Sequence, residues 1–381
     1  MYQTQNIKRQ VIFNIIYLVV VIGLTALAFY LTVGNRMEEI GHTLKSANIW
    51  YIILILIVVI GCIITRSIVI FSLTRIFNRD YSFHRAIAID QIGSLYRMIT
   101  PAGLGSHFMT AYIYTKQKVK LSSALSVLAM YSIVYQIVLI LYGLITIIVK
   151  HDLINEIGYV SIAFNSNDYQ VPLWLLISIG FTFNALVIGF ILLISYWNGF
   201  YRFIRGPILT LLKKIHLVKS LSDKQKDLDD ARDNFRNNLK TLLKNGPVFV
   251  VSITMFFIYI TISYSVPYIC GLALNNASPT ANFWDSVLLS NFHQMVTCII
   301  PIPGSSVVSE LFFYRLFYPT SGPKFYSSEE IARASLLLWR SLMFIIPLII
   351  ACIYTLIYRP RGHKKIEAIK YDNQQNQNPQ E

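Results

Sequence analysis

The sequence predicts an all-α, polytopic membrane protein with six full transmembrane helices and two oppositely oriented re-entrant helical hairpins that form an inverted repeat. Three observations predict this fold: long apolar runs, positive charge gathered between some of them, and two apolar segments broken by proline and glycine. Of the 381 residues, 55% are apolar and 14% are charged, against about 45–50% and about 25% in soluble domains. The mean hydropathy of +0.53 excludes a water-soluble fold.

Six apolar runs are long enough to cross a bilayer, because a hydrocarbon core of about 30 Å needs about 20 helical residues. The first run is too long for the core of a signal peptide and lacks a small-residue cleavage site, so we interpret it as a retained span. The runs define a transmembrane domain over residues 1–358, followed by a basic and then disordered cytoplasmic tail over 359–381. The six runs are Val11–Val33, Ile49–Leu73, Ser123–Val149, Pro172–Tyr196, Val248–Ala273 and Ile331–Tyr358.

The distribution of positive charge predicts the orientation of the chain. The formal net charge is +14, and residues 201–246 alone hold eleven Lys and Arg against five Asp. Basic residues collect in cytoplasmic loops, so we expect both termini and residues 201–246 in the cytoplasm, with anionic lipid heads rather than nucleic acid as the charged partner. An amphipathic helix on the inner membrane surface is predicted within 201–246 by the helical spacing of Leu228, Phe235, Leu239 and Leu242.

Residues 86–122 and 283–317 are apolar but interrupted by glycine and proline. If 86–122 crossed the membrane once, the basic run from Lys116 to Lys120 and the large basic loop would both lie outside, against the charge rule. If residues 86–122 instead form a hairpin that enters and leaves the membrane on the cytoplasmic side, the basic run and the large basic loop both stay in the cytoplasm. The same reasoning predicts that residues 283–317 form a hairpin that enters the membrane from the outside. The alternative is that both segments are kinked full spans.

An internal repeat supports the two hairpins. Placing residue n over residue n+200 aligns Ile99, Pro101, Ser106 and Tyr114 with Ile299, Pro301, Ser306 and Tyr314. Interrupted hydrophobic segments at corresponding positions of two halves are typical of a transporter's binding site, since unpaired backbone at membrane depth survives only in protein or beside a wet cavity. The broken-helix motifs contain Pro101, Gly103 and Gly105 in the first half and Pro301, Pro303 and Gly304 in the second.

Ionisable residues inside apolar segments are functional candidates, because burying charge in a membrane is costly. Asp90 and Arg97 lie seven residues apart, as do Arg333 and Arg340, which places each pair on one helix face. An arginine fork suits the paired oxygens of a phosphodiester, and a carboxylate can hold that fork. The residues predicted to bind a lipid head group are Glu310, Arg340, Arg97, Asp90 and Arg333.

Each of these assignments has a structural alternative. Asp90 and Arg97 also fit an internal ion pair, Arg66 and Arg315 fit cations that extend to the membrane surface, and His107 and His293 fit hydrogen-bonded core residues. No catalytic residue, cofactor or metal site is predicted, because the sequence lacks phosphate-binding and metal-binding motifs and its four cysteines have no metal-like spacing.

The motifs resemble the transmembrane domain of lysylphosphatidylglycerol synthases over residues 10–358. The resemblance is carried by Pro101-Ala102-Gly103-Leu104-Gly105, by Pro301-Ile302-Pro303-Gly304-Ser305-Ser306 up to Glu310, and by Arg340 and Pro347 in the last span. It implies a bacterial plasma-membrane domain that moves aminoacylated phosphatidylglycerol between leaflets. Full-length family members add a cytosolic domain that makes this lipid from lysyl-tRNA, and we expect that domain to be missing after Glu381.

Two departures from the family pattern affect the predicted site. Ser305 and Ser306 stand where the family usually has a second glycine, which predicts a stiffer turn. His107 stands where the family often has an acidic residue, so a head-group role carries over more firmly to Glu310 than to residues near His107.

The leading hypothesis is a flippase-like protein whose partners are anionic or aminoacylated phospholipids, with a separate synthase or a second copy of the chain as a further partner. One alternative is a phosphatidylglycerol lysyltransferase, although a basic loop of about 50 residues is too small to fold a transferase site. The other is a membrane scaffold that docks a separate enzyme through residues 201–246.

Overall fold

The computed structural model describes residues 37–358 except 101–102, 165–166, 198, 200–201, 203–220, 298–301, 306 and 321, together with the single residues 19, 23 and 30. The first predicted span, Val11–Val33, apart from those single residues, therefore lies outside the described part of the chain. The same holds for the predicted tail over 359–381 and for Pro101 and Pro301.

Five helical segments of the described chain are long and apolar enough to cross a membrane, which confirms a helical, multi-pass membrane protein. They begin and end within two residues of the remaining predicted runs. Large side chains such as Ile57, Leu144 and Leu186 are exposed on them, as expected for surfaces that lipid covers. The segments are α3 (Ile49–Arg75), α6 (Leu121–Val149), α8 (Leu173–Tyr196), α12 (Gly246–Tyr264) with α13 (Val266–Ala273), and α16 (Glu329–Arg340) with α17 (Ile346–Ile357).

The last segment contains a local change of helix type at its centre. Residues Ser341–Ile345 form a π-helical turn, in which the Ile346 N–H donates to the Ser341 carbonyl five residues earlier. Pro347 follows directly and has no N–H to donate, so it favours this break in the α-helical pattern. Such single π turns interrupt helices mainly at functional positions, and Arg340 is the last residue before this one.

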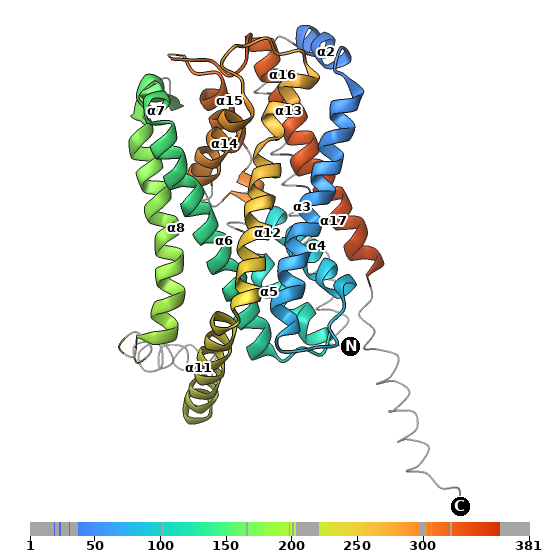
Figure 1. Cartoon of the computed structure of the whole chain (residues 1–381), viewed down its shortest axis with the longest axis vertical. Helices are drawn as coiled ribbons and strands as arrows, with labels where there is room; N and C mark the ends of the chain where they lie inside the picture. The colour runs from blue at the N-terminus through green and yellow to red at the C-terminus, as the bar shows by residue number, and fades with distance from the viewer. Residues whose placement is uncertain are drawn as a thin grey trace, which may run out of the picture.

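Between these segments lie two pairs of shorter helices. The first pair is α4 (Phe83–Ile99) and α5 (Leu104–Lys116), and the second is α14 (Phe283–Thr297) and α15 (Val308–Phe317), joined through the short helix η3 (Pro303–Ser305). At 1.5 Å per residue the four helices are about 25, 20, 22 and 15 Å long. Figure 1 shows the pairs extending into the bundle from opposite ends, with their turns near its middle, and α4 packs against η3.

Each helix pair has its own apolar core. Ile89 and Tyr114 of the first pair are buried with residues of α3, α6 and α12. Phe313 and Phe317 of the second pair are buried with residues of α8 and α16. The division follows the two halves of the chain only in part, because Phe256 and Ile260 of α12 are buried in the core of the first pair. Residues of both cores, including Ile89 and Phe313, line one cavity.

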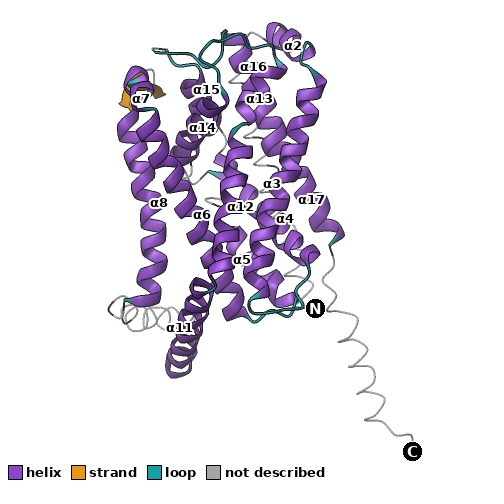
Figure 2. Ribbon diagram, in the orientation of Figure 1, coloured by secondary structure: helices purple, strands orange, loops and turns teal. Residues whose placement is uncertain are grey.

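The ends of the bundle carry the remaining elements. Helix α2 (Met37–Lys45), helix α7 (His151–Ile157) and the antiparallel strands β1 (Tyr159–Phe164) and β2 (Asn167–Pro172) lie at one end (Figure 2). The strands are a small exception to the all-α prediction. Helix α11 (Leu221–Lys244) lies at the other end. Its Leu239 and Leu242 are buried in the core beside α6, so protein rather than lipid covers this part of the predicted amphipathic face.

Candidate functional site

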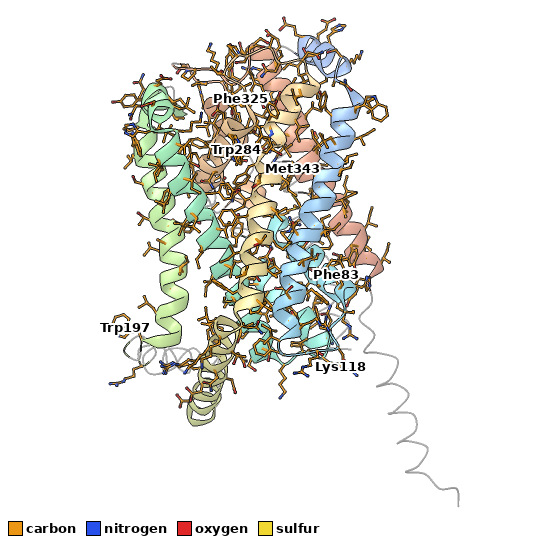
Figure 3. The ribbon with its side chains drawn as sticks, viewed as in Figure 1. Phe83, Lys118, Trp197, Trp284, Phe325 and Met343 are labelled. Atoms are coloured by element: carbon orange, nitrogen blue, oxygen red, sulfur yellow. The ribbon has the colours of Figure 1, made fainter. Side chains whose placement is uncertain are left out.

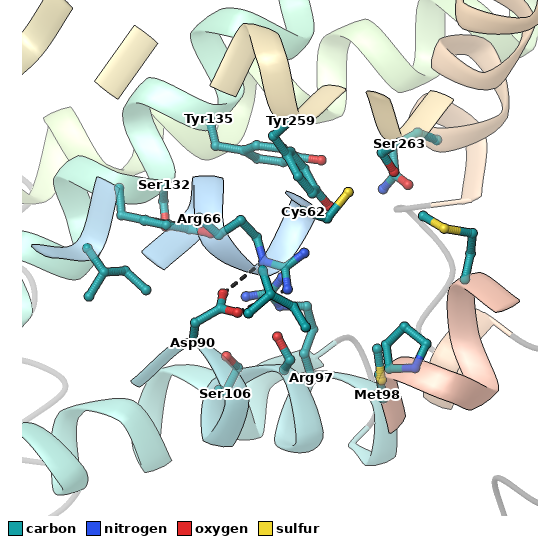
Figure 4. Close-up of a pocket in the computed structure, with 18 of the residues that line it drawn as sticks. Cys62, Arg66, Asp90, Arg97, Met98, Ser106, Ser132, Tyr135, Tyr259 and Ser263 are labelled. Carbon is teal, nitrogen blue, oxygen red and sulfur yellow. Dashed lines mark hydrogen bonds and ion pairs between the residues drawn. The ribbon is translucent and has the colours of Figure 1, made fainter. Parts of the chain in front are cut away.

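A cavity of about 480 Å³ lies between the two helix pairs and the helices around them. Its size is within the usual range of small-molecule sites. Residues from α3, α4, α5, α6, α12, α14 and the last segment line it. Figure 4 shows that Arg66, Asp90, Arg97 and two tyrosines turn toward one shared space.

The turns of both helix pairs adopt the same unusual backbone. Gly103 has φ 66° and ψ 11°, and Gly304 has φ 61° and ψ 12°. These angles fall in the left-handed region that glycine enters without steric cost. The two glycines are one residue out of step in the alignment of residue n with residue n+200, but both break their helix pair in the same conformation, which supports the internal repeat inferred from the sequence.

Gly105 is required for a different reason, namely the close approach of Thr100. The Gly105 N–H donates to Thr100 Oγ1 at 3.0 Å. A Cβ atom at residue 105 would lie 2.5 Å from Thr100 Cγ2, so a side chain there would force the turn apart. This contact closes the first turn next to the cavity.

Ser305 replaces the second glycine of the family pattern at a positive φ of 48°. Its N–H donates to the Ile302 carbonyl at 2.9 Å, and its hydroxyl donates to the Thr297 carbonyl at 3.3 Å. Glycine could not form the second bond. The serine therefore links the turn to the end of α14. This agrees with the stiffer turn expected from the sequence.

Asp90 forms a two-point ion pair with Arg66 of α3. Arg66 Nε and Nη2 donate to the two Asp90 carboxylate oxygens at 2.8 and 3.0 Å, and the guanidinium lies 5.2 Å from the Tyr259 ring centre. The side chains of Arg66 and Asp90 are only 12% and 1% exposed. The interpretation of Arg66 as a cation extending to the membrane surface is therefore wrong, and Asp90 pairs with Arg66 rather than with Arg97.

Arg97 lines the same cavity but has a different environment. It is exposed, and within the described part of the chain it forms no ion pair or hydrogen bond with a side chain. Ser94, Ser106 and His107 lie on the cavity wall near it in sequence, and His107 is exposed rather than a core residue. Since Arg66 neutralises Asp90, Arg97 leaves the cavity with a net positive charge.

Glu310 and Arg340 form a second buried ion pair outside the cavity wall. Arg340 Nε lies 2.6 Å from Glu310 Oε1, and the two side chains are 5% and 2% exposed. Arg340 also donates from Nη2 to the Gly304 carbonyl at 2.9 Å and lies 3.8 Å from the Phe344 ring centre. The pair thus joins α15 and the broken turn to the last transmembrane segment.

Arg333 lies two turns before Arg340, about 10 Å away along the helix. It binds its own partner, Glu329, with nitrogen to oxygen distances of 3.0 and 2.8 Å. Both side chains are partly exposed. The structure therefore separates the five predicted head-group residues into three groups: Asp90 and Arg97 at the cavity, Glu310 and Arg340 behind it, and Arg333 near the end of the bundle.

The two buried ion pairs have the same arrangement. In each, a carboxylate on a short helix of a pair binds an arginine on a full-length segment, Asp90 to Arg66 in the first case and Glu310 to Arg340 in the second. A buried charge without a partner is costly, so each ion pair ties its helix pair to the surrounding bundle.

Sequence reasoning did not identify the aromatic wall of the cavity. Tyr131, Tyr135 and Tyr259 line it together with Ser132 and Gln136. A signal was present, since Tyr131 and Tyr135 lie one turn apart and Ser132 and Gln136 lie one turn apart on an otherwise apolar helix. Arg66 gave a similar signal. It lies nine residues before the end of the apolar helix α3, so a charged side chain stands well inside a transmembrane segment.

His293 lines the cavity as well, and its ring nitrogen Nε2 lies 2.8 Å from the Ser309 carbonyl. It is buried, as expected for a hydrogen-bonded core residue. Within the described residues, no group of three His, Cys, Asp or Glu side chains is placed to hold a metal ion.

Comparison with known proteins agrees with the architecture. No curated protein shows significant similarity to this chain. The model of the lysylphosphatidylglycerol synthase TM region matches residues 14–351 of the 381, which include both helix pairs and the cavity. The chain therefore belongs to the lysylphosphatidylglycerol synthase TM region family.

Proposed function

We propose that this protein moves the head group of an anionic or aminoacylated phospholipid between the leaflets through the cavity. Moving a phosphodiester across hydrocarbon is costly because the charge loses its hydration. A polar cavity near the middle of the bundle lowers that cost while the acyl chains stay in lipid. The observation that carries this proposal is Arg97, a cation on the cavity wall without an ion-pair partner in the described chain.

In this proposal the two helix pairs are re-entrant and approach from opposite membrane surfaces. At about 15–25 Å, their helices are shorter than the roughly 30 Å core of a bilayer. The left-handed glycines at both turns and the packing of α4 on η3 support a meeting of the two turns at membrane depth. Non-helical backbone is acceptable there because it lies beside a polar cavity.

Arg97 would bind the phosphate, with the Ser94 and Ser106 hydroxyls available for the glycerol and ester oxygens. The faces of Tyr131, Tyr135 and Tyr259 would favour a cationic aminoacyl group, since aromatic rings attract ammonium ions. The Arg66 and Asp90 pair joins α3 to α4 beside these rings. Glu310 and Arg340 would act indirectly by holding the second turn.

The orientation of the bundle can be tested by labelling single cysteines. Figure 3 places Lys118 at one end of the bundle and Phe325, the neighbour of Lys324, at the other. In a cysteine-free background, we expect Lys118→Cys to react with a membrane-impermeant thiol reagent only from the cytoplasmic side, and Lys324→Cys to react from the exterior. Reaction of Lys118→Cys in intact cells would contradict the proposed hairpins.

The transport proposal is tested with the purified chain in vesicles that contain fluorescent phosphatidylglycerol. We expect the native protein to accelerate exchange of this lipid between leaflets, measured by chemical quenching of the outer leaflet. Arg97→Gln should slow the exchange about tenfold or more, because a hydrogen bond to a charged group contributes about 1.5–3 kcal/mol.

The matched control is Arg79→Gln, which removes the same charge from an exposed residue outside the cavity and should leave the rate unchanged. Equal rates for native and Arg97→Gln protein, or no exchange above protein-free vesicles, would refute the proposal. Formation of lysyl-lipid from lysyl-tRNA by this chain alone would instead support the transferase alternative.

A further inference from the structure

A second cavity lies where the first helix pair begins and ends, between α4, α5 and α17. Its volume is about 960 Å³, and it shares no lining residue with the first cavity. Arg85, Lys116 and Lys118 line it, and no carboxylate does. Within the described chain none of these three cations forms an ion pair. The cavity is therefore strongly positive.

The opposite wall of this cavity is apolar and aromatic. Ile353 and Ile357 lie one turn apart on α17 and are 51% and 74% exposed. Tyr354 and Tyr358 lie beside them, and their ring centres are 6.0 and 5.8 Å from that of His84. Tyrosines at the boundary between charged and apolar surface are typical of the membrane interface, and Figure 3 places Lys118 at this end of the bundle.

The cavity walls are held together without a ligand. Gln117 is buried, and its amide nitrogen donates to the Tyr358 hydroxyl at 2.9 Å and to the Arg85 carbonyl at 3.1 Å. The Tyr81 hydroxyl donates to the Gln117 amide oxygen at 2.7 Å. These bonds fix α17 against the base of the first helix pair, so the cations and the isoleucines keep a constant relative position.

We propose that this second cavity binds an anionic phospholipid from the adjacent leaflet, with its phosphate at Arg85, Lys116 and Lys118 and an acyl chain along Ile353 and Ile357. A soluble anion would use the cations but leave the exposed isoleucines uncovered. A zwitterionic lipid would cover the isoleucines but carry no net charge to match the cations. The bound lipid bridges α17 and the first helix pair and is separate from the lipid that is transported.

The test measures binding of phosphatidylglycerol to the purified full chain in detergent by native mass spectrometry. The Lys116→Gln/Lys118→Gln variant should bind this lipid about 25-fold more weakly than the native chain, because each basic residue contributes about fivefold near an anionic surface. Both side chains are exposed, so the fold should be retained. Lys120→Gln, an exposed lysine outside the cavity, should bind as the native chain does.

Performing the titration also in the Arg97→Gln background separates this proposal from the transport proposal. The 25-fold difference should persist there, because Arg97 lies in the other cavity. The proposal is overturned if the double variant binds phosphatidylglycerol as tightly as the native chain. It is also overturned if phosphatidylcholine binds equally well, or if glycerol phosphate displaces the lipid at equal concentration.

Discussion

Arg340→Met is expected to lower the free energy of unfolding by about 3–5 kcal/mol, because it leaves the Glu310 carboxylate buried without a counterion. The ion pair is almost fully enclosed, and Arg340 also donates to the Gly304 carbonyl. Both interactions hold the second turn against the last transmembrane segment. The midpoint of detergent-induced or thermal unfolding of the purified chain measures the change.

The double variant Glu310→Gln/Arg340→Met should recover most of this loss, since removing both charges avoids an unpaired buried ion. The matched control is Arg333→Met on the same helix. Its pair with Glu329 is partly exposed, so the loss should stay below about 1 kcal/mol. Equal losses for Arg333→Met and Arg340→Met would contradict the assignment of the buried pair.

Asp90→Asn is expected to lower the free energy of unfolding by about 2–3 kcal/mol, below the usual range for a broken buried pair because Arg66 borders a polar cavity. A double-mutant cycle identifies the partner of Asp90. The coupling free energy between Asp90→Asn and Arg66→Gln should be about 1.5–3 kcal/mol, since both oxygens of Asp90 accept from Arg66.

The same cycle with Arg97→Gln in place of Arg66→Gln should give a coupling below about 0.5 kcal/mol. Arg97 lies seven residues from Asp90 on the same helix and is the partner that sequence spacing favours. A larger coupling to Arg97 than to Arg66 would show that the observed pair is not the one that stabilises the fold, and that Arg97 is not available for a lipid phosphate.

The transmembrane segments could be predicted from the sequence because crossing a bilayer is a local requirement. A run of about 20 apolar residues satisfies it without reference to the rest of the chain, and the boundaries of α3, α6 and α8 follow from composition alone. The broken pairs were also visible, since proline and glycine interrupt two apolar segments, with Pro101 and Pro301 at corresponding positions. Both signals lie in short stretches of sequence.

The tertiary structure decided which charged side chains form ion pairs and which of them reach the cavity. Asp90 lies 24 residues from Arg66, and Glu310 lies 30 residues from Arg340, so helix packing rather than spacing chooses which charges meet. Packing also opens Arg97 to the cavity and encloses Arg340, although both are arginines in apolar segments. An ion pair gains its strength from burial and geometry in three dimensions. Composition and spacing therefore predicted which residues are candidates, while the arrangement of the helices selected which of them can reach a ligand.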